Sequence, residues 1–197
     1  VYKRQVLGGI GGDLINFTVD AAGKMEPTGT DTGEDVILGD NGFALFDAVS
    51  GRSLLREIRT SDDNHGGDDW IFAANGFDVV LGGSGGDMID AGTDESRDVV
   101  LGDNGYALLD EDEVLVEIAS TDPSVGGDDN IVVGDGNDVV VAGVGADYVN
   151  YDRLSGGTIG VDSGQDVILG DNGRALFDAV AGRSLLRDIR TSDVNLS

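Results

Sequence analysis

Apolar residues recur once every nine positions through most of this chain, and glycine and aspartate dominate the positions between them. The clearest run reads NHGGDDWIF (64–72), AANGFDVVL (73–81), GGSGGDMID (82–90) and, after two extra residues, TDESRDVVL (93–101) and GDNGYALLD (102–110). Position 4 of the unit is usually glycine, position 6 is aspartate in all but the last, and position 8 is Ile, Val or Leu. A nine-residue period with one large apolar residue per unit predicts a stacked repeat architecture.

Each nonapeptide divides into a turn and a short strand. Glycines at positions 1, 2 and 4 permit a tight turn of six residues, because glycine tolerates positive φ and close backbone approach. The other three residues, such as 88–90, suit a strand whose middle side chain points to one side and whose neighbours point to the other. The sequence therefore predicts an all-β fold, a parallel β-roll or β-solenoid of Gly/Asp-rich nonapeptides.

The side chain at position 8 is expected to fill the interior of this stack. The residues concerned are Ile15, Ile37, Ile71, Val80, Ile89, Val100, Ile131, Val140, Val149 and Ile168. Positions 7 and 9 are also apolar in Val36/Leu38, Trp70/Phe72, Val79/Leu81, Val99/Leu101, Val139/Val141 and Val167/Leu169. A contiguous apolar outer face is normally covered or forms an interface. We expect folded-back hairpins or a neighbouring molecule to cover it; alternatively, these residues are simply good strand formers.

Segments that break the nine-residue period form a second, longer repeat. The motif DVILGDNG or DVVLGDNG begins at 35, 98 and 166, and residues 166–194 repeat residues 35–63 except at four positions. After each motif comes a predicted β-hairpin, at 43–60, 106–119 and 174–191. We therefore expect one continuous array over 1–197, with super-repeats at about 30–92, 93–160 and, in part, 161–197.

Composition narrows the function. The chain carries 38 acidic and 12 basic residues, a net charge of −26, which argues against nucleic-acid binding because that needs a basic surface. A flexible acidic linker would not keep an apolar residue at position 8. No run approaches the roughly 18 apolar residues of a membrane span, so no membrane insertion is expected. The absence of cysteine excludes disulfides and thiol chemistry.

The position-6 aspartates indicate what holds the turns together. Stacked carboxylates repel one another unless a hard cation lies between them, and calcium takes six to eight carboxylate and carbonyl oxygens. The number of repeated loops predicts roughly six to ten calcium ions. A single histidine, His65, in a glycine-rich turn indicates a turn residue rather than a catalytic base. Because every carboxylate recurs at a repeated position, repeated ligands are favoured over a glycosidase pair.

At GGIGGDLIN (8–16), GGSGGDMID (82–90), VGDGNDVVV (133–141) and AGVGADYVN (142–150) the chain resembles the RTX, or haemolysin-type calcium-binding, family. The super-repeat resembles that of very large secreted bacterial RTX proteins. The resemblance implies a parallel β-roll of two nonapeptides per turn, with calcium between turns on both edges. It also implies type I secretion of the unfolded chain and folding in the calcium-rich exterior.

The resemblance also implies which residues bind calcium. Position-6 aspartates of repeats n and n+2 share ions in that family, which here pairs Asp69 with Asp87, Asp78 with Asp98, and Asp129 with Asp147. The same position is held by Asp13, Asp35, Asp138 and Asp166. In three repeats position 6 is alanine (Ala44, Ala107, Ala175), and there Asp40, Asp103 and Asp171, at position 2, are expected to cap the last ion site instead.

We therefore predict a non-enzymatic, calcium-dependent structural section of a larger secreted or surface bacterial protein, such as an adhesin stalk, filament or matrix layer. Self-association through an apolar face or end to end is a possible mode of assembly. The alternative is an RTX secretion and folding module attached to a secreted enzyme or toxin, although no zinc-protease or nucleophile–base motif is present. An ice-binding surface is disfavoured because no regular outward Thr array occurs.

Overall fold

The structure, a computed structural model, describes residues 4–28, 32–152, 157–158 and 162–192. The described part is all-β and contains no helix, and many of its strands pair in parallel, which confirms the predicted fold class at this level. The expected super-repeat boundaries at 30, 160, 161 and 197 lie outside the described residues.

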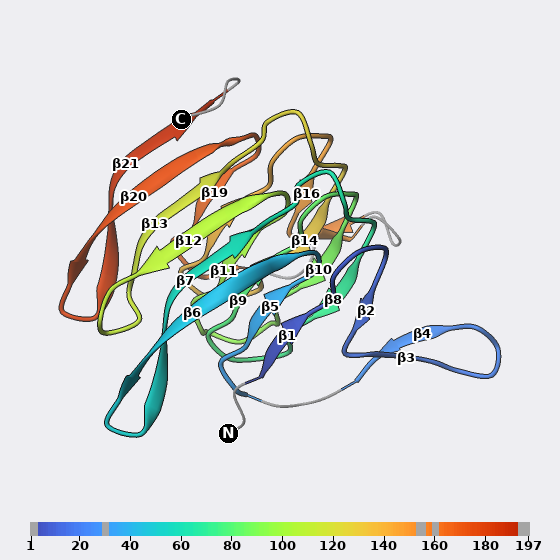
Figure 1. Ribbon diagram of the computed structural model, residues 1–197, viewed down its shortest axis with the longest axis horizontal. Coiled ribbons are helices and arrows are strands. Elements are labelled where there is room, and N and C mark those ends of the chain that lie inside the picture. Colours follow the sequence, from blue (N-terminus) through green and yellow to red (C-terminus); the bar gives the residue numbers. More distant parts are fainter. Residues whose placement is uncertain (1–3, 29–31, 153–156, 159–161, 193–197) are drawn as a thin grey trace.

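Two parallel sheets form the body of the molecule, and the chain passes alternately through them (Figure 1). Sheet A has the order β1 (Gln5–Leu7), β5 (Val36–Leu38), β9 (Val79–Leu81), β11 (Val99–Leu101), β15 (Val139–Val141) and β19 (Val167–Leu169). Sheet B has the order β2 (Leu14–Ile15), β8 (Trp70–Phe72), β10 (Met88–Asp90), β14 (Asn130–Val132) and β16 (Tyr148–Val149). Equivalent repeat positions pair directly, as Val80 does with Ile37 and Val100.

The position-8 side chains of both sheets pack against each other between the sheets. Ile37, Ile71, Val80, Ile89, Val100, Ile131 and Val140 are fully buried there, Ile15 is nearly so, and Val149 packs against the edge of the cluster. This confirms the predicted interior for these positions. The prediction is wrong for Ile168, which is 45% exposed. Its strand, β19, extends sheet A one strand beyond the last described strand of sheet B, so no strand faces it.

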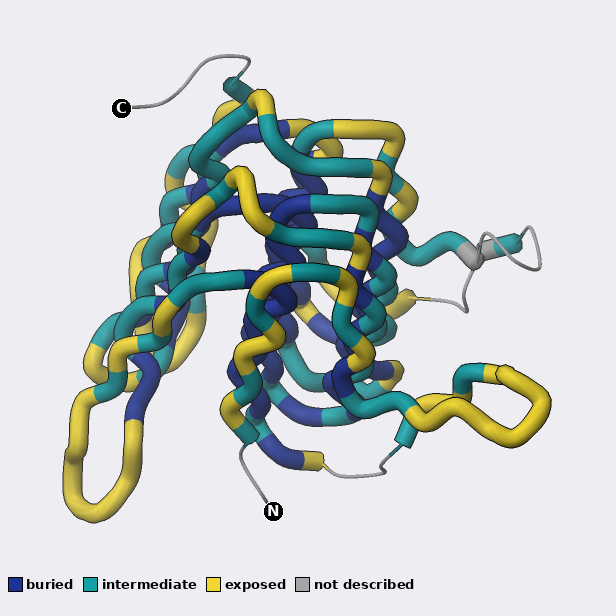
Figure 2. The backbone as a smooth tube through the Cα atoms, turned by 45° about the vertical axis from the view of Figure 1, so that its right-hand side comes forward, coloured by how far each residue is buried: buried dark blue, intermediate teal, exposed yellow. Residues whose placement is uncertain are grey.

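A third, antiparallel sheet covers the outer face of sheet A (Figures 1 and 2). This hairpin sheet consists of three hairpins: β6 (Gly42–Val49) with β7 (Arg52–Thr60), β12 (Gly105–Leu109) with β13 (Leu115–Ser120), and β20 (Gly173–Val180) with β21 (Arg183–Thr191). Leu55, Ile58, Leu115 and Ile118 of this sheet form one buried cluster with the position-7 and position-9 residues of sheet A. Val79 and Leu81 are 1% and 0% exposed, so covering by the hairpins is confirmed for sheet A.

The hairpin sheet and sheet A gain the same number of strands, two each, with every super-repeat. Hairpins follow β5, β11 and β19, which are alternate strands of sheet A, and each hairpin adds two strands to the sheet above. Because strands in any sheet lie about 4.7–4.9 Å apart, two strands of sheet A occupy the same length as one hairpin. The spacing of one hairpin per super-repeat therefore keeps the two sheets aligned.

Trp70 and Phe72 are an exception to the predicted covering, because they belong to sheet B and face away from the hairpins. Phe17 of the small hairpin β3 (Phe17–Val19) and β4 (Met25–Pro27) packs edge-on against both rings, at centroid distances of 5.9 and 6.2 Å. This hairpin projects from the body and is largely exposed (Figure 2). A second small hairpin, β17 (Tyr151–Asp152) with β18 (Gly157–Thr158), brings Tyr151 into a stack with Tyr148.

Candidate metal-binding edges

Loops gather along the two long edges where the chain crosses between sheets A and B. The first edge carries the crossings from sheet A to sheet B: 8–13, 39–69, 82–87, 102–129 and 142–147. The second edge carries the return crossings, of which the structure describes 16–28 with 32–35, 73–78, 91–98, 133–138, and 150–152 with 157–158 and 162–166. Each of these crossings ends with the position-6 aspartate, directly before the next strand. The repeat therefore places one carboxylate at the end of every crossing, next to the first residue of the following strand.

Along the first edge the aspartates form a ladder of backbone-to-carboxylate hydrogen bonds. The N–H of Asp13 donates to Oδ1 of Asp69 (2.7 Å), and that of Asp69 to Oδ1 of Asp87 (2.8 Å). The N–H of Asp87 donates to Oδ1 of Asp129 (2.8 Å), and that of Asp129 to Oδ1 of Asp147 (2.9 Å). Each carboxylate is thus fixed by the crossing before it, and the expected pairs Asp69/Asp87 and Asp129/Asp147 are direct neighbours.

The second edge repeats this arrangement. The N–H of Asp35 donates to Oδ1 of Asp78 (2.7 Å), and that of Asp78 to Oδ1 of Asp98 (2.9 Å). The N–H of Asp98 donates to Oδ1 of Asp138 (2.7 Å), and that of Asp138 to Oδ1 of Asp166 (3.0 Å). The expected pair Asp78/Asp98 is again adjacent, and both edges therefore have the same hydrogen-bond pattern.

The second oxygen of many ladder carboxylates is buried and has no hydrogen-bond donor among the described residues. The Oδ2 atoms concerned belong to Asp13, Asp69, Asp78, Asp87, Asp129, Asp138 and Asp147. Buried polar atoms are normally hydrogen-bonded, and an isolated buried carboxylate is costly unless it is paired or coordinates a metal. A row of such oxygens is an arrangement whose buried charge a bound cation would neutralise.

Backbone carbonyl groups converge on the same points at the first edge. A Cβ atom added to Gly39 would collide with Oδ2 of Asp69 and with the carbonyl oxygen of Gly82. Gly82 is enclosed in the same way by Oδ2 of Asp87 and the carbonyl of Gly102, and Gly102 by Oδ2 of Asp129 and the carbonyl of Ala142. The first residue of these crossings must therefore be small, and the oxygens that surround it are ligands of the type calcium prefers.

Arg4 supplies a cation at the start of the second edge. It lies directly before β1, at the place that aspartate holds in later crossings, and its N–H donates to Oδ1 of Asp35 (2.8 Å). Its guanidinium Nε donates a hydrogen bond to Oδ2 of Asp35 (2.8 Å). Its Nη2 donates to the same oxygen and to the carbonyl oxygen of Ala73, the latter at 2.9 Å. A positive group here bridges a ladder carboxylate and the carbonyl of the next crossing. The sequence reasoning missed Arg4, because 1–7 is only part of a repeat.

The position-2 aspartates play a different part from the ladder. Asp40 and Asp103 are buried, whereas Asp171 is exposed at the last described crossing. Oδ1 of Asp103 accepts the N–H of Gly127 (2.9 Å) and its Oδ2 accepts that of Val144, so this carboxylate joins two neighbouring crossings. Asp40 accepts the N–H of Ser84 through Oδ2 (2.6 Å), and its Oδ1 has no partner among the described residues. Calcium capping by these three residues stays a prediction.

Burial dominates the electrostatics of both edges. It raises the pKa of six ladder carboxyls, with repulsion from neighbouring aspartates as a further cause, while backbone hydrogen bonds oppose the rise; these are Asp69, Asp78, Asp87, Asp98, Asp129 and Asp138. The pKa reaches about 7 for Asp69 and Asp138, about 8 for Asp78 and Asp87, and about 10 for Asp98 and Asp129. Without a cation, Asp78, Asp87, Asp98 and Asp129 therefore favour the protonated form at neutral pH, whereas Asp69 and Asp138 are divided between the two forms.

Two further carboxylates at position 2 lie beside the second ladder. Asp94 repels Asp78, Asp98 and Asp138, and its Oδ1 is buried with no partner among the described residues. Asp162 exchanges a hydrogen bond with Asp166, whose pKa burial and this bond raise to about 6. The sequence reasoning missed both residues, although they stand at the same repeat position as Asp40 and Asp103. No three carboxylate or imidazole groups converge on a single point within the described part of the chain, so backbone carbonyls would have to complete any coordination shell.

Comparison of the chain with protein-family models, curated proteins and solved structures found no match. The described residues include no helix that is long and apolar enough to cross a membrane.

Proposed function

We propose that this chain is a calcium-stabilised β-roll that serves as a structural section of a secreted or surface bacterial protein. The observation that carries the proposal is the row of buried Oδ2 atoms along both edges, each left without a donor among the described residues. The resemblance of the nonapeptides to the RTX repeat points to the same ion.

The donor set fits calcium. Along the first edge, Oδ2 of Asp13, Asp69, Asp87 and Asp129 would each contribute to a separate ion site together with backbone carbonyls, and Oδ2 of Asp78 and Asp138 would do so along the second. Calcium accepts such mixed oxygen ligands in flexible geometry, whereas magnesium demands a stricter octahedron and keeps more of its water. Arg4 supports the assignment, because its guanidinium already bridges one carboxylate and one carbonyl with positive charge.

When bound, calcium supplies the positive charge that lets the buried carboxylates stay ionised. The chain's own residues set the geometry: the backbone N–H groups of the ladder hold each Oδ1, and Oδ2 of Asp69 and of Asp87 lies beside the first residue of its own crossing, Gly39 and Gly82 respectively. Because an ion that binds only the folded state stabilises it in proportion to ion concentration, folding is coupled to free calcium. This coupling suits a protein that folds only after it reaches a calcium-rich exterior.

A structural role is favoured by the regularity of the molecule. The carboxylates repeat at equivalent positions on both edges. No two of the described ladder carboxylates are therefore set apart as a general acid and a general base. The hairpin sheet extends with the stack, which suits a long uniform element. A secretion and folding module of a larger enzyme or toxin is the second candidate, supported by the same calcium-dependent folding.

Circular dichroism in the far ultraviolet, with calcium titrated after treatment with EGTA, tests the proposal. We expect a cooperative change from coil to β-structure with calcium, and a much weaker response with magnesium. The number of ions bound at saturation, measured by equilibrium dialysis, is expected to be roughly six to ten. A spectrum that does not respond to calcium, together with no bound ions, would refute the calcium-dependent fold.

A further inference from the structure

Two nearly identical hairpins lie at different places in the stack, and their burial differs sharply. β6–β7 belongs to residues 35–63 and β20–β21 to residues 166–194, which differ at only four positions. In the first hairpin Leu55 is 2% and Ile58 0% exposed. Their counterparts in the last hairpin, Leu186 and Ile189, are 45% and 43% exposed. Sequence is almost constant between the two, so the difference comes from what lies next to each hairpin.

Two neighbours account for the burial of the first copy: its Leu55 and Ile58 pack in one apolar cluster with residues of sheet A, and its β7 has a second strand neighbour. β7 pairs antiparallel with β12, in the register Arg59 to Tyr106, Ile58 to Ala107 and Glu57 to Leu108. The next joint, β13 with β20, uses the equivalent register, in which Ile118 meets Ala175 and Glu117 meets Leu176. In each joint the second strand of one hairpin therefore meets the first strand of the following hairpin.

The two edge strands of the hairpin sheet are of the two kinds that meet in such a joint. The sheet begins with β21 and ends with β6, and neither has a second strand neighbour among the described residues. β21 is a second strand of the β7 type, and β6 is a first strand that shares the Gly-x-Ala-Leu pattern of β12 and β20. An exposed strand edge with apolar side chains is a template for pairing with another chain.

We propose that β21 of one molecule pairs antiparallel with β6 of a second copy, so that molecules join end to end through the hairpin sheet. The register follows from the two internal joints: Arg190 opposite Phe43, Ile189 opposite Ala44, and Asp188 opposite Leu45. This inference rests on the proposed function, because it requires the folded β-roll, and it identifies the partner as a second copy of the same chain.

The side chains at the two ends complement each other. At the internal joint the guanidinium of Arg59 lies over the ring of Tyr106, 4.2 Å from its centroid. The equivalent residues at the free ends are Arg190, on an exposed strand, and Phe43, which is 38% exposed. A cation over an aromatic ring is attracted by the ring quadrupole, so Arg190 and Phe43 reproduce the contact. Leu45 at the β6 end is exposed as well and would be covered by the same pairing.

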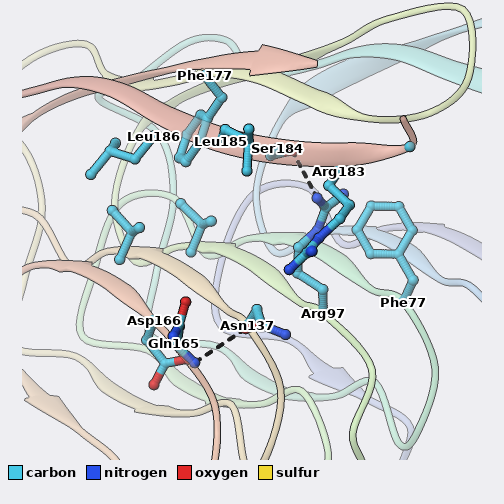
Figure 3. Close-up of a pocket in the computed structure, with 13 residues that line it drawn as sticks. Phe77, Arg97, Asn137, Gln165, Asp166, Phe177, Arg183, Ser184, Leu185 and Leu186 are labelled. Atoms are coloured by element: carbon cyan, nitrogen blue, oxygen red, sulfur yellow. Dashed lines mark hydrogen bonds between the residues drawn. The ribbon is translucent and has the colours of Figure 1, made fainter. Parts of the chain in front are cut away.

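A pocket marks the incomplete end of the layer between sheet A and the hairpin sheet (Figure 3). It has a volume of about 630 Å³ and lies between Val167 of β19 and Leu185 and Leu186 of β21. Beneath the first hairpin the matching Leu55 belongs to the closed apolar cluster. Beneath the last hairpin the layer is therefore open, and polar side chains such as Arg97 and Asp166 line the pocket together with the apolar ones (Figure 3).

The geometry of the joint yields a chain rather than a closed pair. The two surfaces differ, so two joined copies of these residues still present one unpaired β6 and one unpaired β21, and such head-to-tail contacts build open filaments. β19 would lie beside β1 of the next copy and continue sheet A. Sheet A has six described strands and sheet B five, so one strand position of sheet B stays unfilled at the joint. The hairpin sheet and sheet A therefore carry the contact.

Cysteine cross-linking tests the register directly, because the natural chain contains no cysteine. Leu45→Cys and Asp188→Cys are placed on separate molecules, at outward-facing positions that the proposed joint sets opposite each other. Opposed residues of antiparallel strands lie within the Cα separation that a disulfide requires. After mixing in calcium and mild oxidation, we expect a covalent dimer from the mixture, much less from either variant alone, and little from Leu45→Cys mixed with Asp178→Cys.

Sedimentation velocity of the unmodified chain in calcium provides the second measurement. We expect elongated oligomers that grow with concentration, and their loss in Ile189→Asp, which places a charge on the joining face at a position that is exposed in the isolated molecule. Circular dichroism of the same samples separates the two proposals. Calcium-folded protein that stays monomeric and forms no cross-link in the mixture would overturn the end-to-end joint alone. Failure to fold with calcium would overturn the proposed function.

Discussion

The molecule is held together in two contrasting ways. Between sheet A and the hairpin sheet, apolar side chains such as Leu81, Leu115 and Ile118 are fully buried and need no partner other than one another. Along the two loop edges, carboxylates such as Asp87 and Asp129 are equally buried but leave an oxygen without a donor among the described residues. The first region needs only apolar contacts, whereas the second holds buried carboxylates that a bound cation would neutralise.

This contrast predicts which region of the molecule responds to calcium concentration and to pH. Apolar burial contributes about 25 cal/mol per Å² whatever the calcium concentration, and pH affects it little. The buried carboxylates contribute or cost free energy according to whether they are protonated, bound to a cation or bare. Calcium and pH should therefore control the edges, and mutation of the apolar layer should act equally under all these conditions.

The largest expected effect is that of pH on the calcium-free protein. Folding raises the pKa of these aspartates from 3.8 to about 8 for Asp78 and Asp87 and about 10 for Asp98 and Asp129. A raised pKa means that the folded state binds more protons, so its stability is fully present below about pH 4 and is lost as pH rises through about 7 to 10. In EGTA we expect β-structure near pH 4 that melts when the pH is raised to 8.

With saturating calcium the direction should reverse, because protons compete with the ion for the same oxygens. Thermal melts followed by circular dichroism at pH 4, 6 and 8, with EGTA or with calcium, make this comparison. Calcium-free stability that increases with pH would contradict the electrostatic account of the edges.

Truncation in the apolar layer is the next largest effect. Leu115→Ala removes a fully buried side chain of the hairpin sheet and should lower the free energy of unfolding by about 2–5 kcal/mol. The loss should be the same, within error, at low and high calcium. The control is Val49→Ala, at an exposed position near a hairpin tip, which should change stability by less than about 0.5 kcal/mol. A Leu115→Ala defect that calcium abolishes would argue against two independent regions.

A methyl group at the first position of a crossing should act on the edge alone. Gly82→Ala introduces a Cβ that would collide with Oδ2 of Asp87 and the carbonyl of Gly102, and overpacking of this kind typically costs about 1–3 kcal/mol. Gly170 stands at the same repeat position, yet nothing lies within 4 Å of its Cβ position, so Gly170→Ala is the matched control. Chemical denaturation in calcium is expected to show the defect in the first variant only. Equal stability of the two would refute the convergence of oxygens at Gly82.

The smallest expected effect has opposite signs in the two ion conditions. Asp78→Asn keeps an oxygen that can accept the N–H of Asp35 but removes the buried charge. We expect higher stability without calcium, and an affinity for calcium lower by about tenfold, which corresponds to about 1.4 kcal/mol. Asp112→Asn, in an exposed hairpin turn, should change neither quantity. Paired melts and a calcium titration check this, and a loss of stability in both conditions would contradict it.

Much of this arrangement could be predicted from the sequence because it depends on the spacing of residues within the nine-residue repeat. The position of the aspartate before each strand, the inward side chains at position 8 and the hairpins after each DxxLGDNG motif all follow from residue spacing within a repeat. The ladder neighbours Asp69/Asp87 and Asp78/Asp98 follow as well, because two units return the chain to the same edge.

Other features depend on how the repeats stack, which spacing alone does not determine. Trp70 and Val79 both stand at position 7, but one lies on the open face of sheet B and the other beneath the hairpins, and only the path of the chain separates them. Ile168 matches the inward pattern but lies at the end of the stack. Arg4 is recognisable as a ladder residue only when β1 is seen beside β5.

The equal growth of sheet A and the hairpin sheet limits how the gene for such an array can change. Loss of a single nonapeptide would exchange sheets A and B for everything that follows, and later hairpins would then leave from the wrong edge. Loss of two nonapeptides would keep the edges but leave four hairpin strands above three strands of sheet A. Duplication or deletion of a whole super-repeat of about 65 residues preserves both alignments. The length of the array is therefore expected to evolve in steps of that size.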